Sequence, residues 1–387
     1  MKRRVRPLAA YRKGELMSLS DKKLFKFNRR DFLKATGIGA AGLVMPGLTS
    51  KAVAASNTSS KKEVGAARNL IDMEAHFNIK EHCDMLLGKG VRAMNMQTLF
   101  DMGEGRLAQM DENGVKMQVL SQDTGVQMLE PTEGIEWSKK VNNALSEAVM
   151  KYPDRFVGLA SVAPQAPDAG AKELERAVAE LGLKGVCLHS HSMNEYLDHK
   201  KFRPLFAKAQ DLDVPIYLHP AIPSTQILKG YEGYEMLSGP VLGFAAETSL
   251  HAMRLILSGL FDEYPTLKII LGHMGEGLPY FLDRIDFAIR KSPSGKLDTI
   301  QKKPSDYVKE NFFITTSGMF FDPAFICAHL ALGADNIGFA ADYPHEDLES
   351  AVSFIENIPV SDNDKDKICY KNAMKLFKLD KNSRNIS

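Results

Sequence analysis

The sequence contains little of what would assign it to several common classes of protein. Its four cysteines, Cys83, Cys187, Cys327 and Cys369, are widely spaced and form no Cys-x-x-Cys pair, so they offer no thiolate metal motif. Its basic and acidic residues number 49 and 48, and the net charge of +1 argues against nucleic acid as the main partner. No apolar run has the roughly 20 residues needed to cross a bilayer, so we expect no stable membrane span.

The composition does provide for one large folded domain. Of the 387 residues, 44% are hydrophobic and 25% are charged, which is enough for one extensive core. A barrel of eight parallel strands and eight helices takes about 250 residues plus insertions. That architecture fits the length once an N-terminal segment is set aside.

The N-terminal segment resembles an export signal. The pair Arg29-Arg30 precedes Phe-Leu-Lys, a weakly apolar stretch at 35–48 and Ala-Val-Ala at 52–54. This order is typical of a twin-arginine signal followed by its cleavage site. We therefore predict an export signal over residues 1–54, which the twin-arginine machinery recognises, and a periplasmic or otherwise exported product.

Alternatives stay open for this segment. Without an export function it would be a basic, disordered N-terminus, and Met17 is a second possible start. Residues 55–67 are small and polar, which indicates a flexible tether. Residues 68–387 are then left for the predicted barrel domain.

Strand-like and helix-like segments alternate from Leu70 onward, which is typical of βα units. Helical patterns occupy residues 134–152, 166–181 and 200–212. Eight such units favour an α/β fold of the (β/α)₈ TIM-barrel type over a doubly wound sheet. Short apolar runs predict strands at residues 69–73, 116–121, 156–161, 185–189, 214–219, 267–272, 312–316 and 337–341.

Acidic and imidazole side chains stand at the ends of four predicted strands. Glu74 and His76 follow the first strand, His219 ends the fifth, His273 follows the sixth and Asp342 follows the eighth. Such groups are costly at buried strand ends unless something binds them. The C-terminal strand ends of a barrel meet at one face, so the pattern predicts one metal centre there. Taken alone, each residue could be an ordinary polar strand terminus.

The donor types narrow the choice of metal. Glu74 and His76 are two residues apart, so on an extended strand both side chains point to the same side. With His219 and Asp342 they provide imidazoles and carboxylates without thiolates, a set suited to Zn²⁺, Mn²⁺, Fe²⁺ or Mg²⁺. We expect one divalent ion, with Mn²⁺ or Zn²⁺ favoured over Mg²⁺.

Further polar residues follow the fourth and sixth strands. His273 opens the sequence Gly-His-Met-Gly-Glu-Gly, in which Glu276 is placed to hold the imidazole in one tautomer or to orient substrate. We expect His273 to act as an acid or base beside the metal, although it could be a further ligand, and Glu276 could be structural. His189 and His191 could form a second metal pair, but substrate hydrogen bonding by His189 is the favoured interpretation.

Longer motifs of the chain are similar to a known family. The segment GFAAETSLHAMRLILSGLFDEYPTLKIILGHMGEGLPYFLDRID at 243–286 is the most specific, and MEAHF at 73–77, VPIYLHP at 214–220 and ADYPHED at 341–347 add to it. From about residue 70 to 379 the chain resembles the amidohydrolase superfamily. Within it, the chain looks like the non-oxidative benzoate decarboxylases of the γ-resorcylate and 5-carboxyvanillate type.

The resemblance implies roles for the residues at the predicted site. Glu74, His76, His219 and Asp342 would bind the metal. His273 and Glu276 would form the catalytic pair beside it, and either Asp342 or His273 would supply the proton.

The resemblance also implies substrate contacts. Arg284 matches a position that helps to hold substrate, sometimes across a subunit interface, which would require a homo-dimer or tetramer. Arg106 is a weaker candidate for binding the substrate carboxylate. His189 stands where many relatives have Asn, and His345 where they have Tyr or Phe, so we place both in the substrate region.

Three functions are compatible with this set of residues. The resemblance favours a metal-dependent carboxy-lyase that removes CO₂ from a hydroxylated aromatic or similar carboxylic acid. The alternative is a hydrolase of a lactone, amide or ester, in which Asp342 deprotonates metal-bound water and His273 stabilises the oxyanion. A binding module that kept the barrel and lost turnover is the third, and the intact ligand set argues against it.

Overall fold

The computed structural model describes residues 68–91, 93–291 and 299–379. The predicted export signal and tether, residues 1–67, lie outside the described residues, and so does the end of the predicted barrel domain, residues 380–387. None of the described helices combines the length and apolar composition needed to cross a bilayer.

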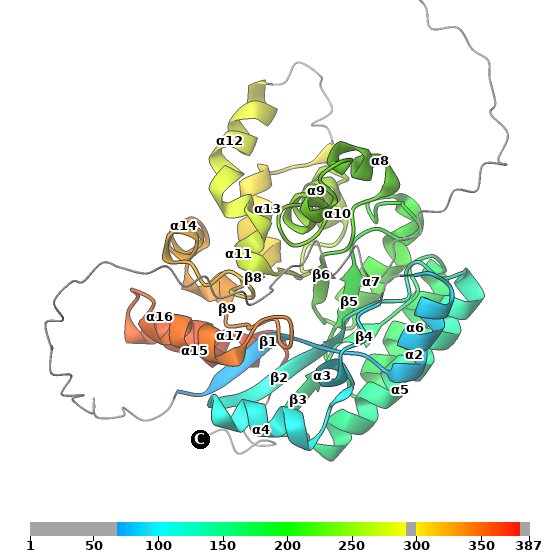
Figure 1. Ribbon diagram of the computed structural model, residues 1–387. Coiled ribbons are helices and arrows are strands. Elements are labelled where there is room, and N and C mark those ends of the chain that lie inside the picture. The colour runs from blue at the N-terminus through cyan, green and yellow to red at the C-terminus, as the bar shows by residue number, and fades with distance from the viewer. Residues whose placement is uncertain (1–67, 92, 292–298, 380–387) are drawn as a thin grey trace, which may run out of the picture. The chain divides into compact units, whose positions relative to one another are not determined.

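Short parallel strands form the centre of the fold (Figure 1). Each of the eight predicted segments overlaps a strand, and the third segment is divided at Leu159. The strands are β1 (Leu70–Phe77), β2 (Val115–Gln122), β3 (Phe156–Gly158), β4 (Ala160–Ser161), β5 (Val186–His189), β6 (Ile216–His219), β7 (Ile269–Leu271), β8 (Phe312–Thr315) and β9 (Ile337–Gly338).

The strands follow one another around a barrel wall. β1, β2 and β3 form one parallel sheet, and β4 to β9 form a second in sequence order, with only Leu159 between β3 and β4. On the other side, main-chain bonds connect β1 to the segment that directly continues β9. The N–H of Met73 donates to the carbonyl of Phe339 at 2.9 Å, and that of His76 to Tyr343 at 2.7 Å. The first and last strands are therefore joined, as a closed barrel requires.

Helices connect the strands and cover their outer face; in Figure 1, α5 and α6 run beside β3 and β4. The α-helices are α2 (Lys80–Gly88), α3 (Gln97–Phe100), α4 (Glu104–Glu112), α5 (Pro131–Lys151), α6 (Pro167–Ala179), α7 (Arg203–Asp211), α8 (Thr225–Leu228), α9 (Gly243–Leu257), α10 (Leu260–Glu263), α11 (His273–Glu276), α12 (Leu278–Lys291), α13 (Pro304–Asn311), α14 (Asp322–Leu332), α15 (Leu348–Asn357), α16 (Asp362–Asp366) and α17 (Asn372–Leu376). Shorter helical turns are η1 (Lys200–Phe202), η2 (Lys229–Tyr231), η3 (Glu235–Ser238), η5 (Ala334–Asn336) and η6 (Lys367–Lys371).

Sequence signals account for several helix ends. Proline occupies the first turn of α6 at Pro167, where its missing N–H leaves no intrahelical bond unmade. Helix α5 ends at Lys151, and its C-cap, Tyr152, directly precedes a proline that disfavours helical geometry in the residue before it. The carboxylate of Asp347 caps α15 by accepting the N–H of Ser350 at 2.7 Å.

The core has two main layers. An inner group packs apolar side chains from nearly every strand, for example Met73, Val119, Tyr217 and Phe313, as expected for the filled interior of a barrel. A larger outer group lies between the strands and the helices. Fully burying one large apolar side chain contributes about 1.5–3 kcal/mol, so these layers supply the rigidity on which the strand ends depend.

Candidate metal centre and active site

A register shift in β1 aims the first two ligand candidates. Met73 packs with the inner core group, whereas Ala75 packs with the outer group. The pairing of β1 with β2 shifts between Asp72 and Ala75, and such an irregularity re-aims side chains. Glu74 and His76 lie within β1 rather than after its end, which corrects the predicted strand boundary, and both side chains are buried.

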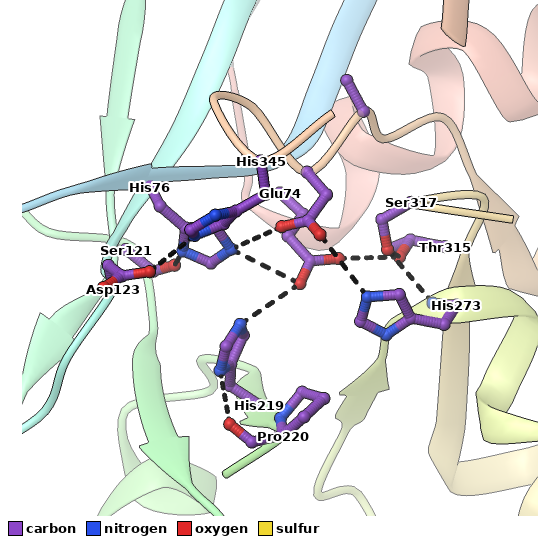
Figure 2. A network of polar contacts seen from close by, with 12 residues as sticks. Glu74, His76, Ser121, Asp123, His219, Pro220, His273, Thr315, Ser317 and His345 are labelled. Carbon is purple, nitrogen blue, oxygen red and sulfur yellow. Dashed lines mark hydrogen bonds and ion pairs between the residues drawn. The ribbon is translucent and has the colours of Figure 1, made fainter. Parts of the chain in front are cut away.

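Three side chains converge at the C-terminal end of the barrel (Figure 2). The Nε2 atoms of His76 and His219 lie 3.7 Å and 3.6 Å from Oε1 of Glu74. One ligand atom from each of the three residues lies within 4.8 Å of the other two. Glu74 Oε1 and His76 Nε2 are buried and make no hydrogen bond. Buried polar atoms are normally satisfied, so this pair points to a bound cation.

Asp342 approaches the same group from the segment after β9. Its Oδ1 lies 2.9 Å from His76 Nε2 and is also buried without a hydrogen bond. It does not belong to the group of mutual 4.8 Å contacts, so the structure gathers three of the four predicted ligands most closely. The φ angle of Asp342 is 74°. This left-handed conformation is energetically unfavourable for a residue with a Cβ, and such backbone strain is concentrated at functional sites.

The charge states of two ligand candidates, Glu74 and His219, suit a metal. Burial raises the pKa of Glu74, but His76 and the charge of His273 outweigh it and lower the pKa to about 2. Burial and the neighbouring imidazoles of His76 and His189 lower the pKa of His219 well below its ordinary value. Glu74 is therefore ionised and His219 neutral near pH 7, and these are the forms that bind metal ions.

Neighbouring groups orient the ligand candidates. His219 donates from Nδ1 to the carbonyl of the next residue at 2.8 Å, which leaves Nε2 facing Glu74. Ser121 Oγ lies 3.2 Å from His76 Nδ1, and Thr315 Oγ1 donates to Glu74 Oε2 at 3.5 Å. Partners of this kind fix the tautomer and ring orientation of metal ligands.

His273 and Glu276 are carried by an unusual turn directly after β7. Within α11, the φ angles are 49° at His273, 55° at Met274, 72° at Gly275 and 54° at Glu276. This left-handed turn is costly for residues with a Cβ. It brings Glu276 Oε1 to 2.8 Å from His273 Nδ1, and the main-chain N–H of His273 donates to Ser317 Oγ at 3.1 Å.

The pair retains a proton on the imidazole. Burial lowers the pKa of His273, but Glu276 and Asp342 raise it well above its ordinary value. Its Nε2 lies 3.6 Å from Oδ2 of Asp342. His273 therefore has the position and charge of a proton donor beside the candidate metal centre, and it lies outside the group of mutually close ligand atoms.

His189, the last residue of β5, lies next to the candidate metal centre, and His191 follows two residues later. The ring centroid of His189 lies 5.0 Å from that of His219, and its Nε2 is 2.7 Å from the carbonyl of Gln122. Burial lowers the pKa of His189 to about 4. His191 Nε2 is 3.1 Å from the carbonyl of Ile222, and in the described part of the chain His191 belongs to no group of three close ligand candidates. The pair therefore does not form a second metal group with other candidate ligands there.

His345 lies at the edge of the centre and contacts a residue that sequence reasoning missed. Its Nε2 is 2.6 Å from Oδ1 of Asp123 (Figure 2). Asp123 follows the last residue of β2. The rule that identified the other strand ends would have identified Asp123 as well, had it been applied to the second strand.

Arg106 lies in α4 and does not reach the candidate site. Its guanidinium donates to the carbonyls of His76 at 2.6 Å, Asp101 at 2.7 Å and Thr98 at 3.2 Å, and to the side chain of Gln118 at 3.2 Å. The side chain is fully buried. These bonds use the guanidinium to hold the end of β1, which argues against the predicted contact with a substrate carboxylate.

Arg284 lies on α12, where it is exposed. Its guanidinium carbon is 5.8 Å from the ring centroid of Phe287 on the same helix. The structure therefore does not bring Arg284 together with the other site residues of its own chain through any hydrogen bond or ion pair in the described ranges.

Comparison with known proteins supplies the context for this geometry. The chain is 41% identical over 291 residues to a gamma-resorcylate decarboxylase from Polaromonas sp. strain JS666, covering 73% of this chain and 89% of that protein. It is 39% identical to the gamma-resorcylate decarboxylase of Rhodococcus jostii, over 80% of this chain and 99% of that protein. A solved dihydroxybenzoic acid decarboxylase from Polaromonas, with bound manganese and the inhibitor 2-nitroresorcinol, superposes with a TM-score of 0.75 at 39% identity, covering 81% of this chain and 97% of that chain.

These similarities confirm the predicted resemblance, the α/β barrel fold, the class of carboxy-lyase and the requirement for a divalent metal. The model of the amidohydrolase family matches residues 71–379, which include every candidate ligand. The chain therefore belongs to the amidohydrolase family.

Proposed function

We propose that this protein is a metal-dependent, non-oxidative decarboxylase of a hydroxylated aromatic carboxylic acid, with 2,6-dihydroxybenzoate as the first substrate to test. The observation that carries the proposal is the convergence of Glu74, His76 and His219 beside a protonated His273. The similarity to gamma-resorcylate decarboxylases supports the same chemistry.

The residues of the centre fit a divalent metal. Glu74 Oε1, His76 Nε2 and Asp342 Oδ1 are buried atoms without hydrogen bonds. Burial lowers the pKa of His76, but Asp342 and Glu74 outweigh it and raise the pKa to about 10, so a bound metal would take the place of the proton on Nε2. The mixed nitrogen and oxygen set without thiolates suits Mn²⁺ or Zn²⁺. We assign Glu74, His76, His219 and Asp342 as the residues that would hold the ion.

The chain's own residues would hold and deliver the proton. When bound, the metal would offset the negative charge of the substrate carboxylate and orient the aromatic ring. His273 would transfer its Nε2 proton to the carbon of the substrate ring that bears the carboxylate. Meanwhile the carboxylate of Glu276 would accept a hydrogen bond from Nδ1 of the imidazole and hold its orientation. The bond to the carboxylate then breaks, its electron pair restores the aromatic ring, CO₂ leaves, and solvent returns a proton to the imidazole. A placed acid contributes about 10²–10⁴-fold.

The test is decarboxylation by the full chain loaded with Mn²⁺ in D₂O. We would supply 2,6- and 2,3-dihydroxybenzoate and 5-carboxyvanillate, with aromatic lactones in parallel as hydrolase substrates. The proposal predicts one CO₂ per product and one deuterium at the vacated ring carbon. Lactone opening without CO₂ release would show the alternative hydrolase, because the same residues could activate water.

We further propose that the protein acts as a homo-oligomer. Large apolar side chains are exposed on α12 and on α14, which packs against it: Tyr280 is 76% exposed and Leu330 80%. Arg284 lies on this face and would contact substrate only across an interface between copies. Light scattering of wild type and of the double variant Tyr280→Lys, Leu330→Lys tests this, and an unchanged monomer mass in both would reject it.

The export proposal rests on Arg29-Arg30 and the residues that follow. Replacing both arginines by lysine keeps the charge but removes the paired-arginine signal. The proposal predicts accumulation of the variant in the cytoplasm and of wild type in the periplasm. Equal distribution of the two proteins after cell fractionation would reject it.

A further inference from the structure

Asp123 and His345 form a polar pair at the edge of the candidate site (Figure 2). Asp123 follows β2, and His345 lies in the segment after β9, so the pair reaches across the end of β1, which lies between those strands. The ring centroid of His345 is 5.5 Å from that of His76. The pair therefore stands beside the metal centre without belonging to it.

The two partners differ in exposure. The side chain of Asp123 is 7% exposed, and that of His345 is 28% exposed. Oδ2 of Asp123 accepts hydrogen bonds from Thr124 Oγ1 at 2.9 Å and from Asn78 Nδ2 at 3.2 Å, while Oδ1 faces His345 Nε2 at 2.6 Å. Both oxygens of the carboxylate are engaged by donors, so the carboxylate is a fixed anchor for one nitrogen of the imidazole.

The second nitrogen of His345 is left for another partner. An ionised carboxylate only accepts hydrogen bonds, so Asp123 requires a proton on Nε2. Among the described residues no hydrogen bond to Nδ1 of His345 is formed. If His345 only connected two loops, its bond to Asp123 would be sufficient for that structural role. A partly exposed ring with one anchored and one open nitrogen is instead the form of a recognition group.

We propose that the Asp123–His345 pair selects substrates by hydrogen-bonding a second ring hydroxyl, in addition to the one that would lie at the metal beside the carboxylate. The inference rests on the proposed function, because the aromatic ring must be held at the metal centre. A hydroxyl both donates and accepts, so it can pair with Nδ1 in either protonation state of the imidazole. The pair would thus make polyhydroxylated benzoates better substrates than a benzoate with one hydroxyl.

The size of the selection follows from general hydrogen-bond energetics. A site built to bond a hydroxyl rejects an analogue without it, because the polar group of the protein is then left unpaired. One such bond at a partly exposed position corresponds to roughly a 10-fold preference in kcat/KM. Discrimination, not overall rate, is the quantity that separates recognition from a merely structural contact.

The experiment compares 2-hydroxybenzoate with its 2,3-, 2,4-, 2,5- and 2,6-dihydroxy derivatives in the Mn²⁺-loaded full chain. Variants are His345→Phe, which keeps an aromatic ring without nitrogens, His345→Gln, which keeps a donor and an acceptor, and Asp123→Asn. His329→Phe on α14 is the matched control, since that ring stacks on Phe325 outside the site at 5.8 Å. Metal content is measured for every protein.

The proposal predicts that wild type prefers at least one dihydroxybenzoate by roughly 10-fold over 2-hydroxybenzoate. His345→Phe should abolish that preference, Asp123→Asn should weaken it, His345→Gln should restore part of it, and the control should keep it. An equal loss of kcat/KM for every substrate in His345→Phe would overturn the proposal and show that the pair has only a structural role. The same conclusion would follow if all dihydroxybenzoates kept their advantage in that variant.

A binding measurement separates this proposal from the proposed function. Calorimetric titration with 2-nitrophenol and its hydroxylated derivatives uses ligands without a carboxylate to lose. If no acid releases CO₂, the proposed function fails, and the hydroxyl preference in binding still tests the pair. If CO₂ is released but neither kcat/KM nor binding depends on the extra hydroxyl, the pair's role fails alone.

Discussion

Two walls of the active site are built in different ways. On the β1–β9 wall, Glu74 and His76 lie within a strand whose main chain is bonded on both sides, to β2 and to the segment after β9. On the β7–β8 wall, His273 and Glu276 lie on a left-handed turn just after the strand. The difference suggests a division of labour: a rigid strand for the residues that would hold a metal, and a strained turn for those that would move a proton.

The β1–β9 wall is reinforced by a buried polar network. Oδ1 of Asp72 accepts the N–H of Ala341 at 2.9 Å and that of Glu74 at 3.2 Å, and Oδ2 accepts from Gln118 Nε2 at 3.0 Å. Gln118 in turn accepts from Arg106. One carboxylate thus ties the strand of Glu74 to the segment that ends in Asp342. Fully satisfied networks of this kind rigidify a core.

The β7–β8 wall is reinforced by side-chain hydroxyls instead. Ser317 Oγ accepts the N–H of His273 at 3.1 Å and lies 3.0 Å from Thr315 Oγ1, which also reaches Glu74. The turn itself packs closely: a Cβ at Gly275 would lie 2.9 Å from Cγ2 of Ile314. Hydroxyl hydrogen bonds and close packing therefore hold His273 in place, whereas main-chain hydrogen bonds between strands hold His76.

Asp342→Asn should have the largest effect, because Asp342 contacts both walls. The amide keeps the shape but loses the charge that faces His76 and His273. We expect turnover to fall roughly 10⁴-fold and metal content to fall with it. Product formation and elemental analysis measure the two effects. Asp335→Asn, at an exposed ion pair with Lys367, is the control, and an active, metal-replete Asp342→Asn would contradict the assignment.

His273→Asn tests the second wall alone. Removing the imidazole removes the proton donor, so we expect turnover to fall about 10³-fold while the metal is retained. Metal retention is the decisive result, because it distinguishes this variant from Asp342→Asn, in which we expect the metal content to fall. Elemental analysis of purified protein, with His329→Asn as the control, measures it. Loss of the metal would show that His273 is a ligand, and the two walls would then not have separate roles.

Most of the fold could be predicted because it depends on local patterns. Each apolar run that predicts a strand becomes one, and ligand types at strand ends identify Glu74, His219 and Asp342 as neighbours without knowledge of the loops. This reasoning works where a side chain's direction follows from strand geometry alone.

The remainder depends on long-range contacts that a sequence does not display. Arg106 is 30 residues from His76, and only the folded chain shows that its guanidinium is engaged by that carbonyl. Asp123 gains its significance from His345, 222 residues away. The predicted roles of both arginines came from the resemblance, and the structure places neither of them at the centre of its own chain.

Arg106→Met tests the support of the first wall. The variant keeps the apolar stem but leaves buried acceptors without donors, including the carbonyl of His76. Unsatisfied buried groups cost about 1–3 kcal/mol each, so we expect a loss of about 3 kcal/mol in the free energy of unfolding and weaker metal binding. Urea denaturation and metal titration measure these, with the partly exposed Arg155→Met as the control. A raised KM with unchanged stability would instead restore the predicted substrate contact.

Gly275→Ala should have the smallest effect and should act on the second wall only. An added Cβ meets Ile314 and Pro279 at 2.9 Å and 3.2 Å in a backbone with φ of 72°. Gly182 has the same φ of 72° and nothing within 4 Å of its Cβ position, so Gly182→Ala measures the backbone strain alone. Such strain costs about 1 kcal/mol or more. We expect both variants to lose stability to urea, but only Gly275→Ala to lose turnover, about 10-fold, with the metal retained. Equal turnover in the two variants would mean that catalysis tolerates a shift of the turn that carries His273. The strained conformation of the turn would then serve packing and would not be needed for proton transfer.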